Sequence, residues 1–315
     1  MEVYICIEII LLVLLFKQRK YQFEYAAISF LLMLMAAIRS EFVGADVRVY
    51  FIEYEWNGAK SWKDALTSPE YSFTIYCKFL NSLRLGNYGF LVVTAILFAI
   101  LLALAIETNH SNRILTLSLY YFAGLYTQSF CVIRQSFAAV ISLIAYSSLE
   151  KNYSLRIQYN KGHFQSFPIG FVIGMIIAIG FHPTVIVLFA LPVMMLFYGK
   201  KRCRKPSVFL RDGILCMSAA LIILPVLYPF ILQHSNKKYQ DLYGCGYVTG
   251  PFGNWKSGIL LVALYLIFYI AYYNNWKKLT EKENIIVGSV IMLAFACSSL
   301  SIINSTLGRT NLFFE

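Results

Sequence analysis

Charged residues are scarce in this chain: Asp, Glu, Lys and Arg make up 14% of its 315 residues, against about a quarter in a typical soluble domain. The deficit is uneven, because long apolar runs alternate with short charged clusters. Between Gly162 and Gly199 no charged residue occurs, and between 114 and 149 only Arg134 interrupts the apolar sequence. A lipid bilayer selects for such runs. The scarcity argues against an ordinary soluble enzyme and predicts an integral membrane protein.

The sequence also lacks the motifs of several common enzyme classes. It contains no P-loop, no GxSxG, no HExxH and no DxD-like pair. These absences argue against ATP-dependent, serine-hydrolase, zinc-protease and nucleotide-sugar chemistry. The seven cysteines are scattered, with no CxxC pair, so we expect neither a zinc site nor a disulfide framework. We therefore predict chemistry that uses no metal and no cofactor.

The apolar runs predict an all-α polytopic bundle of about ten membrane-spanning helices. The predicted spans are 2–16, 22–38, 88–106, 114–128, 131–149, 167–181, 184–198, 213–232, 257–274 and 284–304. A single helix from Gly162 to Gly199, at about 1.5 Å per residue, would be nearly twice as long as the roughly 30 Å hydrocarbon core. His182-Pro183 lies at the centre of that run, and proline disfavours helix at the residue before it. Both long runs are therefore interpreted as helical hairpins, turning near His182 and near 128–134.

The basic residues indicate how the chain crosses the membrane. With the N-terminus outside, five inner loops contain 16 of the 27 lysines and arginines, as the positive-inside bias requires. These loops are 17–21, 107–113, 150–166, 199–212 and 275–283. We attribute the net charge of +11 to this bias and expect membrane lipids, not nucleic acid, as partners. The outer face then carries two long segments, 39–87 and 233–256, of a single membrane domain over 1–315.

Segment 39–87 has the composition of an interfacial fold. It holds two tryptophans and several tyrosines, which suit the headgroup region, and its six basic residues are balanced by six acids. Ser68-Pro69-Glu70 is typical of a helix start, with a serine cap, a proline in the first turn and an acid near the positive end of the helix dipole. We expect this amphipathic helix to continue to about Leu83.

Polar residues near the predicted span ends gather on the outer face. They are Arg39, Asp46, Glu70, Arg134, Gln135, His182 and Arg309. Arginines beside a membrane suit a phosphate or diphosphate, because the guanidinium fork binds these oxygens in bidentate fashion. A carboxylate or histidine nearby can take a proton from an attacking hydroxyl. Each residue alone also has an ordinary interpretation, as an interface anchor, a helix cap or a turn residue, so the hypothesis depends on their convergence.

Four ordered motifs carry a family resemblance. They are Arg39-Ser-Glu-Phe-Val-Gly44-Ala-Asp46-x-x-x-Tyr50, Pro69-Glu70-Tyr71, Ile133-Arg134-Gln135-Ser-Phe-Ala138 and Ala178-Ile-Gly-Phe181-His182-Pro-Thr. Together they resemble the EpsG family of membrane proteins, which is similar to the Wzy polymerases of bacterial surface polysaccharides. The resemblance covers about 35–190, with Arg309 as a weaker C-terminal match. Proline follows His182 where the family often has serine. Because relatives usually continue with further spans after the position of Arg309, we expect this chain to be C-terminally short relative to the family.

The resemblance implies an enzyme, a metal-independent glycosyltransferase of the bacterial inner membrane. It would polymerise oligosaccharide repeat units carried on undecaprenyl diphosphate at the periplasmic face, with a chain-length regulator as a further partner. The growing chain would leave its lipid diphosphate for a hydroxyl of the next unit. Two alternatives stay open, a flippase for the same lipid-linked sugars and a ligase that moves finished polymer to another lipid.

The same resemblance assigns hypothetical roles to the outer-face residues. Three arginines, Arg39, Arg134 and Arg309, would hold the donor diphosphate and stabilise it as it leaves. Gln135 would orient a sugar hydroxyl. Asp46 or Glu70 would serve as the general base, and His182 would be a third candidate for that role or a phosphate ligand.

Overall fold

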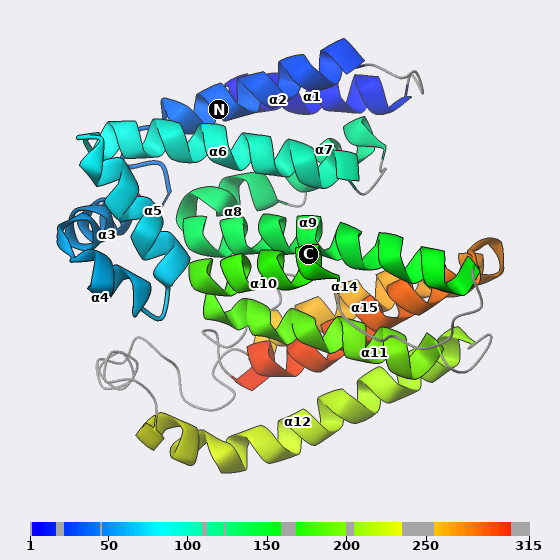
Figure 1. Cartoon of the computed structure of the whole chain (residues 1–315). Coiled ribbons are helices and arrows are strands. Elements are labelled where there is room, and N and C mark those ends of the chain that lie inside the picture. The colour runs from blue at the N-terminus through cyan, green and yellow to red at the C-terminus, as the bar shows by residue number, and fades with distance from the viewer. Residues whose placement is uncertain are drawn as a thin grey trace. The chain divides into compact units, whose positions relative to one another are not determined.

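The chain is helical throughout the part that its computed structural model describes (Figure 1), which comprises 2–16, 22–44, 46–108, 112–122, 124–158, 168–199, 205–234 and 255–303. Within these ranges no strand occurs, so the predicted all-α class is confirmed there. The chain divides into two compact units, which are described separately. The first unit comprises Met1–Tyr159 with Gln165–Ile186, and the second comprises Asn160–Phe164 with Val187–Glu315.

The first unit contains most of the predicted site. Its helices are α1 (Glu2–Phe16), α2 (Gln22–Ala37), α3 (Val47–Ala59), α4 (Trp62–Leu66), α5 (Tyr71–Ser82), α6 (Asn87–Thr108), α7 (Arg113–Phe122), α8 (Leu125–Cys131), α9 (Ile133–Gln158) and α10 (Ile169–Phe181). In Figure 1, α2, α6, α9 and α10 lie side by side in that order, and each packs against the next. The 22 residues of α6 span about 33 Å, enough to cross the hydrocarbon core.

Both predicted interruptions of the long apolar runs are present. In the first run, α8 ends at Cys131 and α9 starts at Ile133, within the predicted turn region. A further break, which the sequence analysis did not predict, lies at Gly124, whose φ of +76° is a left-handed conformation that glycine adopts without steric cost. In the second run, α10 ends at Phe181 and His182 is extended, as expected for a residue that precedes proline.

Segment 39–87 folds into α3, α4 and α5, with α3 packed on α5. The predicted cap of the third helix was wrong. Helix α5 begins at Tyr71 with Glu70 as its N-cap, and no side-chain capping bond forms. The Ser68 hydroxyl instead accepts a hydrogen bond from the Thr74 hydroxyl at 3.1 Å. The Glu70 carboxylate is engaged elsewhere, as described below.

The second unit contains α11 (Ala190–Gly199), α12 (Pro206–His234), α14 (Trp255–Asn275), η2 (Trp276–Lys278) and α15 (Glu281–Ile303). Along the chain, η1 (Pro183–Phe189) precedes α11. Helix α15 packs against α11, α12 and α14, and a Cβ on Gly288 would lie 2.5 Å from the Phe209 ring, so the glycine permits close approach of α12. Arg309 and most of segment 233–256 lie outside the described residues.

Apolar helices dominate the described residues. Two stretches, α6 and Pro206–Ile223 of α12, are long and apolar enough to cross a membrane, and several shorter helices are also apolar. Phe23, Ile222 and Leu260 are each more than two-thirds exposed, as befits side chains that face lipid. These features indicate a membrane protein. The ten spans, their orientation and the single membrane domain stay predictions.

Candidate functional site

Arg134, in the first turn of α9, pairs with two carboxylates. Its Nη1 donates to Oε2 of Glu70, and its Nη2 lies 3.5 Å from Oε1 of Glu53. Since Glu53 belongs to α3 and Glu70 is the N-cap of α5, one guanidinium links three helices. The side chains of Arg134, Glu53 and Glu70 are 22%, 19% and 25% exposed. They are therefore open to a solute, yet sheltered enough for their charges to interact more strongly than on an open surface.

Two buried aromatic rings complete the surroundings of Arg134. Its guanidinium carbon lies 5.6 Å from the ring centroid of Tyr50 and 5.5 Å from that of Phe73, within the range of cation–π attraction. Burial raises the pKa of Tyr50 above its ordinary value, although the charge of Arg134 acts in the opposite direction. Tyr50 therefore stays neutral near pH 7 and keeps its hydroxyl proton.

His182 reaches the same carboxylate from α10. Its Nδ1 lies 3.4 Å from Oε1 of Glu70, while Oε2 of Glu70 accepts from Arg134. The Glu70 carboxylate therefore lies between an imidazole and a guanidinium. We call Glu53, Glu70, Arg134 and His182 the carboxylate cluster.

Close packing of α10 on α5 places His182 there. A Cβ on Gly180 would lie 2.2 Å from the Ser72 hydroxyl and 2.5 Å from the Tyr71 ring, so only glycine fits at this crossing. The Tyr71 hydroxyl donates to the backbone carbonyl of Ile176. The Gly-Phe-His sequence thus provides the helix crossing at Gly180, the buried ring of Phe181 and the imidazole of His182, which contacts Glu70.

Stacking of two phenylalanines connects α9 with α10. The rings of Phe137 and Phe181 are 5.2 Å apart with an interplanar angle of 17°. Phe137 follows Arg134 by nearly one helical turn, and Phe181 immediately precedes His182. The pair therefore fixes the spacing between the two helices that carry the cation and the imidazole.

The other predicted site residues that the structure describes are Asp46, Gln135 and Arg39. Asp46 is the N-cap of α3 without a side-chain capping bond, and it forms no ion pair with any residue that the structure describes. Gln135 is buried on α9. Arg39 follows α2, is 8% exposed, and donates to the carbonyl of Ala36 at 2.9 Å. The structure therefore brings together three of the predicted residues, Glu70, Arg134 and His182.

Glu53 was missed by the sequence analysis, which counted it only among the acids of its segment. A periodic signal was available. Asp46, Tyr50 and Glu53 are spaced by four and three residues, which places them along one face of a helix. Because Tyr50 is buried and Glu53 is partly buried, this face is the one that α3 turns toward α5 and α9.

The cluster offers acid–base chemistry beside a cation. Glu70 can accept a proton, His182 can share it, and Arg134 can stabilise negative charge. Among the described residues, no group of three or more His, Cys, Asp or Glu side chains is arranged to hold a metal ion.

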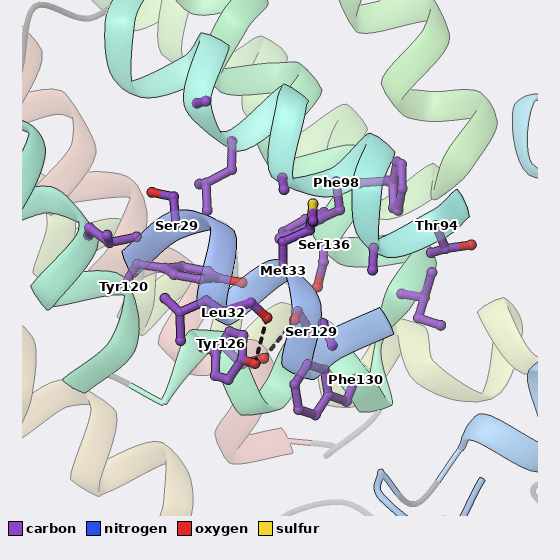
Figure 2. A pocket seen from close by; sticks show the side chains of 18 of the residues that line it. Ser29, Leu32, Met33, Thr94, Phe98, Tyr120, Tyr126, Ser129, Phe130 and Ser136 are labelled. Atoms are coloured by element: carbon purple, nitrogen blue, oxygen red, sulfur yellow. Dashed lines mark hydrogen bonds between the residues drawn. The ribbon is translucent and has the colours of Figure 1, made fainter. Parts of the chain in front are cut away.

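A cavity that is partly open to the surroundings adjoins the same turn of α9. Ile133, Ser136 and Phe137 line it, so α9 turns one face to the cavity and presents Arg134, on another face, to the cluster. Figure 2 shows the cavity bordered by Met33 of α2 and Phe98 of α6. Arg39 is also part of its wall, with its guanidinium carbon 4.5 Å from the centroid of the Phe130 ring.

The EpsG family model matches residues 23–315. No curated protein and no solved structure gives a match. The family match covers far more than half of the chain and includes all four motifs and every residue of the carboxylate cluster. It confirms the resemblance found in the sequence. The chain belongs to the EpsG family, a membership that implies a role in the biosynthesis of surface polysaccharides.

Proposed function

We propose that the chain is a glycosyltransferase that polymerises oligosaccharide repeat units carried on undecaprenyl diphosphate. Its family supports a role in surface-polysaccharide synthesis, and its apolar helices suit a lipid-linked substrate. The observation that carries the proposal is the Glu70 carboxylate held between Arg134 and His182. This arrangement pairs a proton acceptor with a cation, the two functions that transfer from a diphosphate requires.

In the proposed reaction, a hydroxyl of the acceptor unit attacks the anomeric carbon of the growing chain. A new carbon–oxygen bond forms there, and the bond from that carbon to the diphosphate breaks. The lipid diphosphate leaves with the bonding electron pair, and the hydroxyl proton passes to Glu70. The sugar–diphosphate bond supplies the energy, so no nucleotide takes part.

Of the three proposed bases, Glu70 suits the role best. Its contact with His182 gives the proton a second acceptor at 3.4 Å, whereas Asp46 forms no ion pair with any residue that the structure describes. Protonation of Glu70 weakens its attraction for Arg134, while Glu53 still holds the guanidinium. Arg134 can then turn an N–H group toward the leaving diphosphate. In this scheme Arg39 and Arg309 are further diphosphate ligands, and Gln135 orients a sugar hydroxyl.

We assign the cluster to the periplasmic face of the inner membrane, with the N-terminus on that side. The distribution of basic residues supports this topology, because 16 of 27 then fall in inner loops. The exposed Trp56 and Trp62 on α3 and α4 also support it, because tryptophan favours the headgroup region. A chain-length regulator is a proposed partner at this face.

Purified protein in nanodiscs, incubated with undecaprenyl-diphosphate-linked repeat units, tests the proposal. We expect a ladder of polymers on a gel, and a rate at least about 100-fold lower for Arg134→Ala. Arg113→Ala is the matched control, because it removes another arginine–glutamate pair of the same unit, in which Arg113 Nε lies 2.5 Å from Glu107 Oε1. This variant should leave the ladder unchanged. Single transfers would indicate a ligase, and translocation without new bonds a flippase; either result would contradict the proposal.

A further inference from the structure

The cavity beside α9 is elongated along the helices that form it. Its lining on α6 extends from Thr94 to Ile106, a rise of about 18 Å, or over half of the hydrocarbon core. The residues Ala95, Ala99 and Ala103 follow one another at intervals of four and all line it. A stripe of the smallest side chains on an otherwise leucine-rich helix therefore leaves room for a long, narrow occupant.

The cavity wall is mostly apolar, and several of its polar groups bond within the protein, although the buried hydroxyls of Ser29 and Tyr120 have no hydrogen-bond partner among the described residues. The hydroxyl of Thr94 contacts that of Tyr76 at 2.9 Å. The hydroxyls of Tyr126 and Ser129 donate to backbone carbonyls at 2.9 and 2.6 Å, as Figure 2 shows. Arg39 is the one charged residue among the described residues that line the cavity, and the rest of the lining is mostly carbon. Such a wall matches an occupant with an apolar chain and one anionic group.

The cavity and the carboxylate cluster share the first turn of α9. Phe137 lines the cavity and stacks on Phe181, next to His182. Ile133 lines the cavity and immediately precedes Arg134. If Arg39 holds the anionic group of a bound molecule, the atoms attached to that group would therefore extend toward the carboxylate cluster.

We infer that this cavity binds the isoprenoid chain of the lipid-linked substrate, with Arg39 against its diphosphate. The inference rests on the proposed function, and it assigns the substrate's lipid part to a site of its own. The isoprenoid is much longer than the cavity, so only the units next to the diphosphate lie inside. Arg39 binds the diphosphate before reaction, and Arg134 stabilises the same group as it leaves.

Binding measurements on the purified full-length chain test the inference without requiring polymerisation. The probe is undecaprenyl diphosphate, and its affinity is measured in nanodiscs of a neutral lipid. Ala99→Phe fills the cavity and should weaken binding at least about tenfold. Ile100→Phe is the matched control, because Ile100 is the next residue of α6, is 51% exposed and does not line the cavity, and its binding should match that of the wild type.

A second probe, undecaprenol, separates the chain from its charge. Arg39→Gln should weaken binding of the diphosphate by about 10- to 100-fold and leave binding of the alcohol within twofold of the wild type. Ala99→Phe should weaken binding of both. A photoreactive isoprenoid should label α2 and α6 of the wild type, which provides a check if a variant folds poorly.

Three outcomes would overturn the inference: unchanged affinity in Ala99→Phe, labelling elsewhere, or equal competition by phosphatidylglycerol, which would mark a general lipid slot. Failure of the proposed function has a different signature, because binding would follow the expected pattern while no polymer formed. If the wild type polymerises and its Ala99→Phe variant binds undecaprenyl diphosphate normally, the proposed function stands and the inference about the cavity fails.

Discussion

The carboxylate cluster and the cavity stabilise their arginines in different ways, although they share one turn of α9. In the cluster, Arg134 is held by Glu53 and Glu70 and remains about one-fifth exposed. In the cavity wall, Arg39 is nearly buried, donates to a backbone carbonyl and lies over the ring of Phe130. A proton that reaches Glu70 changes the forces on Arg134. We therefore expect proton-coupled chemistry at Arg134 and diphosphate binding at Arg39.

Neutralising Glu70 should produce the largest difference between the two regions. Glu70→Gln keeps the shape of the side chain and removes its basicity, so the polymerisation rate should fall about 10³-fold. Binding of undecaprenyl diphosphate, measured in the same nanodiscs, should change less than about threefold. Asp46→Asn is the paired variant and should retain at least about a third of the rate. A reversed result, with Asp46→Asn inactive and Glu70→Gln active, would transfer the base to Asp46.

Glu53→Gln tests whether Arg134 needs its second anchor. The variant leaves Arg134 paired with Glu70 alone, so the guanidinium loses its hold when Glu70 is protonated, and the rate should fall about 10- to 100-fold. The control is Glu55→Gln on the same helix, where an exposed carboxylate accepts a hydrogen bond from Asn87 at 2.9 Å. Equal rates for the two variants would remove Glu53 from the mechanism.

His182→Gln should lower the rate about tenfold and alter its dependence on pH. The imidazole lies 3.4 Å from Glu70, close enough to share the proton that Glu70 accepts. Initial rates measured from pH 5 to 9 distinguish this role from a structural one. A uniform loss at every pH would mean that His182 only packs against α5.

Sequence patterns predicted the helices better than the site. The break at His182 was predictable because proline restricts the residue before it, and α12, α14 and α15 cover predicted apolar runs. The capping of α5 was not predictable, since Glu70 is drawn to Arg134, which is 64 residues away in sequence. Local propensity cannot register such a long-range ion pair.

Glu53 and the cavity were missed for related reasons. In the sequence alone, Glu53 cannot be distinguished from the other acids of its charged segment, because its role depends on the packing of α3 against α5. The stripe of Ala95, Ala99 and Ala103 resembles ordinary small residues of a span until α2 and α9 close around it. In both cases the residue spacing is visible in the sequence, but the structural neighbours that make it significant come from other parts of the chain.

Gly180→Ala should disturb the cluster through packing alone, with the smallest effect on rate of these changes. The added Cβ would lie 2.2 Å from the Ser72 hydroxyl, so α10 must shift or α5 must yield, at a cost of about 1–3 kcal/mol in stability. A thermal melt should show the loss, and the rate should fall a few-fold as His182 moves away from Glu70. Gly86→Ala is the control, because a Cβ there meets nothing within 4 Å. Undecaprenyl diphosphate should still bind normally, since α10 does not line the cavity, and a parallel loss of binding would mean that the two regions act as one.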